Sequence, residues 1–148
     1  MDWISESKRL FNSAKPEHFT NYTHCDECNE HDETLRNSNL ETISMEQLGN
    51  PAWDPMCFCS IEGKKYYMSA LIRLCVETIE SNNPYLSQLL FHLEWDGENN
   101  DLIISCTTEQ RAFIASFIQH LIESYPKVIE DNFCSDNALR VYEIWKPA

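Results

Sequence analysis

The chain has 148 residues, of which 43% are hydrophobic and 11% aromatic, so it can bury a core of ordinary size without disulfide bonds. Its 24 acidic and 11 basic side chains give a net charge of −13, which disfavours direct binding to nucleic acids and anionic membranes. Only three glycines occur, and neither G-x-G-x-x-G nor G-x-x-x-x-G-K-[ST] is present, so nucleotide binding through a glycine-rich phosphate loop is excluded.

The cysteine content indicates a reducing compartment. There are seven cysteines, an odd number, and the start at Met1 lacks a charged segment followed by an apolar run. No apolar stretch approaches the roughly 18 residues that a membrane-spanning helix needs. We therefore expect a cytoplasmic protein whose thiols are free or metal-bound rather than paired in disulfides.

The hydrophobic pattern predicts helices along most of the first half of the chain. Apolar residues with a three-four spacing predict a helix over residues 3–14, ended by a proline because the residue before it avoids the α region. A second helix is expected from the cysteine-rich segment to about Arg36, and Ser44 can cap a short turn. Residues 50–55 contain two prolines and predict a loop whose Trp53 packs inward.

Helical spacing continues in the second half. Apolar stripes predict a core helix over residues 64–79, another that starts at Asn83-Pro84, and a third between Thr107 and Tyr125-Pro126. Thr107-x-x-Gln110 is a capping box, in which both side chains bond to backbone N–H groups at the helix start. A last helix is expected after a cap at Ser135-Asp136, with four apolar side chains on it: Leu139, Tyr142, Ile144 and Trp145.

One segment has the composition of a strand. Residues 102–106 follow a polar turn at 97–101 and form a short segment that contains β-branched residues. This segment could pair with residues 58–61. The expected fold is a single, mainly α domain over residues 1–148, with about six helices and at most one short β pair.

Residues 24–31 contain more metal-binding chemistry than any other segment. Two thiols and two imidazoles fall within eight residues, at His24, Cys25, Cys28 and His31. Thiolate and neutral imidazole are ligands that zinc prefers, and C-x-x-C is a spacing at which two thiolates can bind one tetrahedral ion. A helical segment would place three of these ligands on one face, so a closed structural site needs a fourth from elsewhere.

The preferred ligand set is Cys25, Cys28, His31 and one thiol of the C-x-C pair, with Cys59 placed ahead of Cys57. An extended C-x-C directs both side chains to one face, which makes this pair the best donor. His24 remains an alternative fourth ligand, although neighbouring His24 and Cys25 are not expected to bind the same ion.

Other interpretations of the cluster stay open. Cys25 and Cys28 can be small core residues at a helix start, or a redox pair, although a thioredoxin-type pair needs a βαβ context. His31-Asp32 is similar to the His-Asp pair of metal phosphohydrolases, whose chemistry requires further ligands on other helices. No G-x-S-x-G, H-E-x-x-H or S-x-x-K motif is present, and no residue is assigned a catalytic role.

Several segments have distinctive sequence motifs: KPEHFTNYTHCDEC at 15–28, EHDETL at 30–35, NPAWDP at 50–55, YYMSAL at 66–71 and TEQRAF at 108–113. In them the chain resembles an uncharacterised bacterial family of small proteins, known as a domain of unknown function. The resemblance covers most of the chain, with a departure at Ser69, where the family has a proline. It implies a bacterial or phage origin and a stand-alone domain, and carries over no catalytic residue.

The acidic surface suggests the kind of partner. We expect a small non-catalytic binding module that occupies a basic protein, such as a nucleic-acid-binding protein, as immunity proteins and phage inhibitors do. A zinc ion at the Cys/His cluster would stabilise it. The alternative is a metal-dependent hydrolase with zinc at Cys25, Cys28 and His31 and an open position for water.

Overall fold

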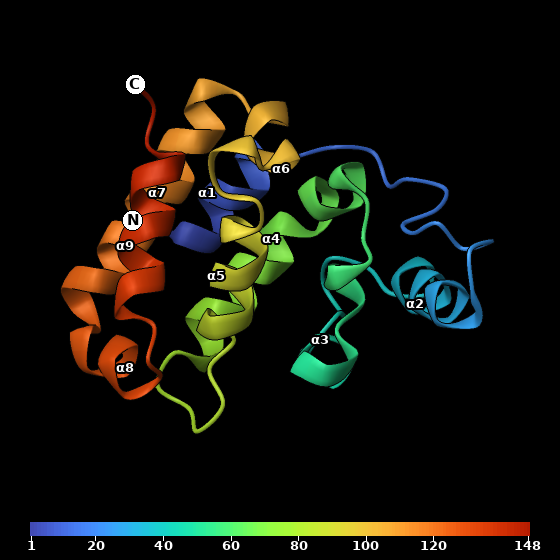
Figure 1. Cartoon of the computed structure of the whole chain (residues 1–148), viewed down its shortest axis with the longest axis horizontal. Coiled ribbons are helices and arrows are strands. Elements are labelled where there is room, and N and C mark those ends of the chain that lie inside the picture. Colours follow the sequence, from blue (N-terminus) through green and yellow to red (C-terminus); the bar gives the residue numbers. More distant parts are fainter. The chain divides into compact units, whose positions relative to one another are not determined.

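The computed structural model describes all 148 residues (Figure 1). It contains nine α-helices and three short 3-10 helices, joined by irregular segments, and no strand. The mainly α prediction is confirmed. The α-helices outnumber the expected six because three further segments form short helices of four to six residues: the turn after Ser44, the expected strand at residues 102–106 and the segment that begins at Pro126. None of the helices combines the length and the hydropathy of a membrane span.

The backbone divides into two compact units, Met1–Val76 and Glu77–Ala148, whose border falls in the last turn of α4 (Ile61–Thr78). Each unit is described by itself below. The single domain expected over residues 1–148 stays a prediction, because a division of contacts does not show whether either half folds alone.

Capping side chains start the helices of the first unit. Asp2 accepts a hydrogen bond from the Ser5 N–H (3.1 Å) at the start of α1, and Ser44 forms a full capping box with Gln47. The helix predicted over residues 3–14 ends early, since the Asn and Ser that follow Phe11 favour turns. The elements before α4 are α1 (Trp3–Leu10), α2 (Asp26–Arg36), α3 (Met45–Leu48) and the 3-10 helices η1 (Pro51–Trp53) and η2 (Pro55–Cys57).

Two side chains of α4 fix the irregular segment that follows α2. The fully buried Tyr67 donates its hydroxyl proton to the Leu35 and Ser38 carbonyls, at 2.6 and 3.0 Å. Arg73 Nη2 donates to the Leu40 and Ile43 carbonyls, at 3.1 and 2.6 Å. Backbone carbonyls without a helical partner are thus satisfied inside the unit, as buried carbonyls require.

The second unit is a helical bundle in which α9 is central. Its α5 and α7 pack on α9, and α7, α8 and α9 lie side by side, orange to red in Figure 1. The capping box at Thr107 and the break at Tyr125-Pro126 are both confirmed. The elements of this unit are α5 (Leu86–Glu94), η3 (Gly97–Asn99), α6 (Asp101–Ser105), α7 (Thr108–Ser124), α8 (Pro126–Asp131) and α9 (Ser135–Trp145).

Trp145 anchors α9 in the core of this unit. Its side chain is fully buried, and its indole N–H donates to the Leu93 carbonyl at the end of α5, at 2.8 Å. Of the apolar residues expected on this helix, Leu139 lies on its solvent side. Ser135 is the first helical residue rather than the cap, which is Cys134.

The expected β pair is absent. Residues 102–106 lie in and just after α6, because the Asn100 side chain accepts a hydrogen bond from the Leu102 N–H (2.7 Å) and so starts a helix. Residues 58–60 form the irregular segment that leads into α4, and Ile61 is the first residue of that helix. Local capping overrides a strand propensity that is weak over so few residues.

Candidate functional site

A thiol caps the start of α2. Cys25 is the N-cap residue and has an extended backbone (φ −163°, ψ 171°), and its Sγ accepts a hydrogen bond from the Cys28 N–H at 3.4 Å. This bond is the one that a serine or threonine oxygen usually makes at a helix start. The C-x-x-C spacing therefore places both thiols at one helix end.

Three metal-binding side chains converge there. The Sγ atoms of Cys25 and Cys28 lie 3.1 Å apart, and His24 Nδ1 lies 3.7 Å from Cys28 Sγ. One donor atom from each of His24, Cys25 and Cys28 lies within 4.8 Å of the other two, so these groups could hold a single metal ion. His24 and Cys25 are exposed, whereas Cys28 is buried.

The ligand set differs from the preferred one. Neighbouring His24 and Cys25 were not expected to share an ion, yet both contribute to the group. The reason is the extended backbone at Cys25, which turns the chain at the helix start and brings the preceding imidazole back to Cys28. Cys25 and Cys28 are brought together as predicted, and His31 and Cys59 are not in the group.

The two thiols have opposite pKa shifts. Hydrogen bonds from the Cys28 N–H, the Cys28 thiol and His24 lower the pKa of Cys25 to about 7. The hydrogen bond to Cys25, burial and the Cys25 and Glu27 charges raise the pKa of Cys28. Near neutral pH Cys25 is therefore partly ionised to the thiolate, whereas Cys28 stays a thiol that loses its proton when a metal binds.

We expect Cys25 to be alkylated faster than any other cysteine at neutral pH. Because thiolate is the reactive form, the rate of iodoacetamide modification at Cys25 should reach half its maximum near pH 7. Cys57 is the matched exposed thiol, and burial with the Asp54 charge raises its pKa above the ordinary value of 9.0. Peptide mapping of metal-free protein over a pH series measures both rates, and equal rates at pH 7 would contradict the assignment.

His31 lies apart from the cluster, in an aromatic environment. It is fully buried between Trp53 and Phe58, with ring centroids 4.5 and 4.8 Å away. Neither ring nitrogen has a hydrogen-bond partner, and Nε2 lies 3.6 Å from a Glu27 carboxylate oxygen, which is too far for one. Trp53 is half-exposed rather than packed inward, because it covers His31 from the solvent side.

Cys59 is a packing residue in the structure. It is buried, and burial raises the pKa of its thiol to about 12, which disfavours a thiolate. Its Sγ lies only 2.5 Å from where a side chain on Gly63 would begin, so this glycine is needed for close packing. The segment is not extended as expected, because Pro55 and the Asp54 cap form a 3-10 helix, and Cys57 is exposed while Cys59 is buried.

A buried carboxylate fixes the loop before the cluster. Asp32 accepts hydrogen bonds from the Phe19 N–H (2.6 Å) and the Thr20 N–H (3.1 Å), and its other oxygen lies 2.8 Å from His18 Nδ1. Thr20 in turn donates its hydroxyl proton to the Cys28 carbonyl at 2.7 Å. Asp32 therefore pairs with His18, not with the adjacent His31, and its role is to position the loop.

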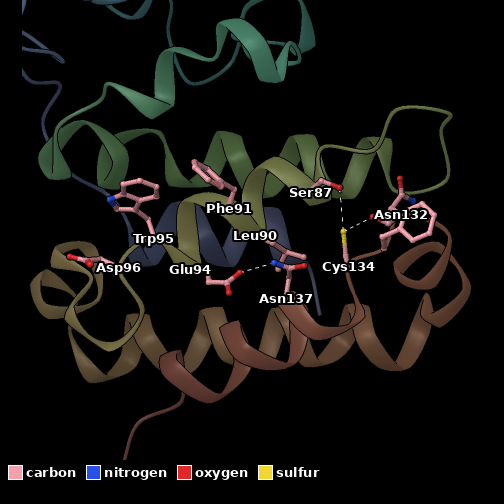
Figure 2. A pocket seen from close by; sticks show the side chains of 10 residues that line it. Ser87, Leu90, Phe91, Glu94, Trp95, Asp96, Asn132, Cys134 and Asn137 are labelled. Carbon is pink, nitrogen blue, oxygen red and sulfur yellow. Dashed lines mark hydrogen bonds between the residues drawn. The ribbon is translucent and has the colours of Figure 1, made fainter.

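The second unit contains an open groove between α5 and the α8–α9 turn (Figure 2). Its volume is about 400 Å³, and no basic side chain lines it. Glu94 is held by Asn137 (2.8 Å) and paired with Arg140, whereas the Asp96 carboxylate has no partner. The lining residues are Ser87, Leu90, Phe91, Glu94, Trp95, Asp96, Asn132, Phe133, Cys134 and Asn137.

Three aromatic rings of the groove are exposed to solvent. Phe91, Trp95 and Phe133 are 48%, 62% and 92% exposed, and the rings of Phe91 and Trp95 lie 5.5 Å apart. All three side chains line the same groove, and exposed apolar side chains gathered in this way are typical of surfaces that bind another molecule.

Phe133 occupies a position that normally favours glycine. It follows α8 with φ +57°, and the Cys134 and Phe133 N–H groups donate to the Ile129 and Glu130 carbonyls, which is the Schellman pattern. Asp96, with φ +66°, is the other non-glycine residue of the chain with positive φ, and it also lines the groove. A left-handed backbone costs an L-residue about 1–2 kcal/mol, and the exposed Phe133 ring recovers little of this inside the chain.

The sequence predicted His24 only as an alternative fourth ligand, and it did not predict the groove. A signal for His24 was available, because a thiol at an N-cap requires an extended residue, and the residue before it can then reach the first helical turn. The groove had no such signal, since Phe91 and Phe133 are far apart in the sequence and Phe133 was not assigned to any element.

No protein-family model, curated protein or solved structure matches the chain. The resemblance to the bacterial family therefore stays a prediction, and function has to be argued from these two sites.

Proposed function

We propose that the protein is a non-catalytic, cytoplasmic binding module whose second unit docks a basic segment of a protein partner in the aromatic groove. The partner class we favour is a nucleic-acid-binding protein, occupied as an immunity-type or phage-type inhibitor would occupy it. The observation that carries the proposal is Phe133, an exposed aromatic residue with a strained backbone that lines the same groove as two other exposed aromatic residues.

Charge supports a basic occupant. The second unit has twelve acidic and four basic side chains, and the groove has two carboxylates and no basic group. Arginine and lysine stack on aromatic faces, with contributions of about 0.5–2 kcal/mol. The Asp96 carboxylate is free to pair with such a cation, and complementary charge also speeds association.

Replacing Phe133 with glycine should separate stability from binding. The free energy of unfolding of Phe133→Gly should be about 1 kcal/mol higher than that of the wild type, since glycine relieves the left-handed backbone strain. Its affinity for a synthetic peptide rich in arginine and leucine should fall about tenfold, as expected for loss of an interface anchor. Urea unfolding and fluorescence anisotropy measure the two effects.

The matched control is Ile104→Ser, which removes an exposed apolar residue (69%) of the same unit outside this groove. It should bind the peptide as the wild type does, and binding should weaken as salt rises to physiological ionic strength. The proposal would be contradicted if Phe133→Gly bound the peptide with wild-type affinity. It would also be contradicted if a peptide with glutamate in place of arginine bound the wild type as tightly as the arginine peptide does.

The first unit contributes a zinc site in this proposal. Two thiols and an imidazole favour zinc over magnesium or calcium, which prefer oxygen ligands. His24, Cys25 and Cys28 supply three ligands, and the exposed side leaves the fourth to water or to the partner. The ion would hold the loop before α2 against the helix start.

Zinc content tests the ligand set. Purification in reducing, chelator-free buffer should give one zinc per chain, and His24→Ala, Cys25→Ser and Cys28→Ser should each lower zinc affinity by more than about a hundredfold. His31→Phe and Cys59→Ala are the controls, and both should keep wild-type affinity because neither residue belongs to the group. Loss of zinc in the controls, but not in His24→Ala, would support the ligand set expected from the sequence.

A second candidate, a zinc hydrolase, is favoured by the exposure of His24 and Cys25, since a catalytic zinc keeps one position open for water. Zinc-loaded protein and Cys28→Ser can be compared on chromogenic ester and phosphoester substrates. Turnover that disappears with the metal while the helical circular dichroism persists would support the enzyme.

A further inference from the structure

The two sulfurs of the cluster lie at an intermediate distance. Cys25 Sγ and Cys28 Sγ are 3.1 Å apart. A disulfide bond is about 2.05 Å long, and two sulfurs bound to one tetrahedral zinc at about 2.3 Å lie roughly 3.8 Å apart. The observed sulfur–sulfur distance therefore differs from that of either state by about 1 Å or less.

We propose that Cys25 and Cys28 are a reversible redox pair that forms an intramolecular disulfide by exchange with a small-molecule disulfide, such as glutathione disulfide. Release of the metal on oxidation rests on the zinc site proposed above, whereas disulfide formation does not. The pair thereby makes occupancy of the site dependent on the redox state of the surroundings.

The exposure of the two sulfurs sets their order of reaction. Cys25 is exposed and can attack an incoming disulfide, while Cys28 is buried directly behind it. Attack of the Cys25 thiolate breaks the S–S bond of the small disulfide, forms a mixed disulfide and releases one thiolate. Cys28 then attacks the Cys25 sulfur, and the second small thiol leaves.

Atoms and electrons balance over the two steps. The two protein thiols lose two electrons and two protons in all, and the small disulfide is reduced to two thiols. His24 Nδ1, 3.7 Å from Cys28 Sγ, is a base placed to take the Cys28 proton and pass it to the departing thiolate.

The other cysteines are less suited to this reaction. Cys59 and Cys75 are buried, which keeps them from a disulfide in solution. Cys57 is exposed as Cys25 is, and it is therefore the matched control for reactivity that depends on exposure alone.

Mass spectrometry of metal-free protein tests the pair. After equilibration with mixtures of reduced and oxidised glutathione and acid quenching, the wild type and Cys57→Ser should lose two hydrogen atoms and contain a Cys25–Cys28 crosslink that dithiothreitol reverses. Cys28→Ser should instead accumulate glutathione on Cys25, because the resolving thiol is gone. Absence of the crosslink in folded wild type, or no adduct on Cys25 in Cys28→Ser, would overturn the proposal.

A second readout uses zinc-loaded protein and a colorimetric zinc indicator. One zinc should be released for each disulfide formed, and zinc that stays bound to the oxidised protein would overturn the coupling. If the protein binds no zinc, the proposed zinc site is wrong. The presence or absence of the crosslink in metal-free protein still tests whether Cys25 and Cys28 form a disulfide.

Discussion

Replacing Trp145 with alanine is expected to lower the free energy of unfolding by about 3–5 kcal/mol. The indole is fully buried in the second unit, and its N–H bond to the Leu93 carbonyl joins the end of α9 to the end of α5. The substitution leaves a large cavity in the bundle and removes this bond. Since domains are stable by about 5–15 kcal/mol, urea unfolding followed by circular dichroism should show a large shift of the midpoint.

Trp95→Ala is the matched control, because Trp95 is 62% exposed and lines the groove. This change should alter stability by less than about 0.5 kcal/mol while weakening binding of the basic peptide. If Trp145→Ala were no more destabilising than Trp95→Ala, the packing of α9 described here would be wrong.

Replacing Asp32 with alanine is the second large effect, with an expected loss of about 2–5 kcal/mol of unfolding free energy. The carboxylate accepts the Phe19 and Thr20 N–H groups, and an unsatisfied buried donor costs about 1–3 kcal/mol. The loop that carries His24 should also loosen, so zinc affinity should fall. Urea unfolding and zinc titration measure these effects, and Glu30→Ala, at an exposed site on the same helix, should change neither.

The contribution of Asp32 should depend on pH. Burial raises the pKa of this carboxyl, but the hydrogen bonds from His18, Phe19 and Thr20 outweigh it, so the folded pKa is lower than the ordinary value. A carboxyl with a lowered folded pKa stabilises the protein above its unfolded pKa of about 3.9, and this stabilisation is lost as pH falls through the folded pKa. The stability advantage of wild type over Asp32→Asn should therefore shrink below about pH 4, and a constant difference would contradict the assignment.

The sequence predicted the helices that have strong local signals. The cap at Ser44, the capping box at Thr107 and the break at Pro126 are all observed, because side-chain capping and proline act within one helical turn. The strand predicted at residues 102–106 is wrong. The Asn100 cap is a local signal of the same kind, and it favours a helix at this position. The exposure of Leu139 depends on the packing of α9 in its unit, which a helical period alone does not specify.

The candidate sites were predictable only in part. Cys25 and Cys28 follow from a spacing within one helical turn, and the structure brings them together. His31 and Cys59 were chosen by helical phase and by an assumed extended segment, and neither assumption describes where these side chains lie. The groove combines residues from α5 and from the turn before α9, so only the tertiary structure places them together.

Titration of ¹⁵N-labelled protein with the arginine- and leucine-rich peptide tests the docking groove most directly. The four tryptophans each give one indole N–H signal. We predict that the Trp95 signal shifts progressively to saturation, whereas the buried Trp145 and the Trp53 signal of the first unit stay in place. A shift at Trp53 with none at Trp95, or no shift of any indole signal, would contradict docking in the groove.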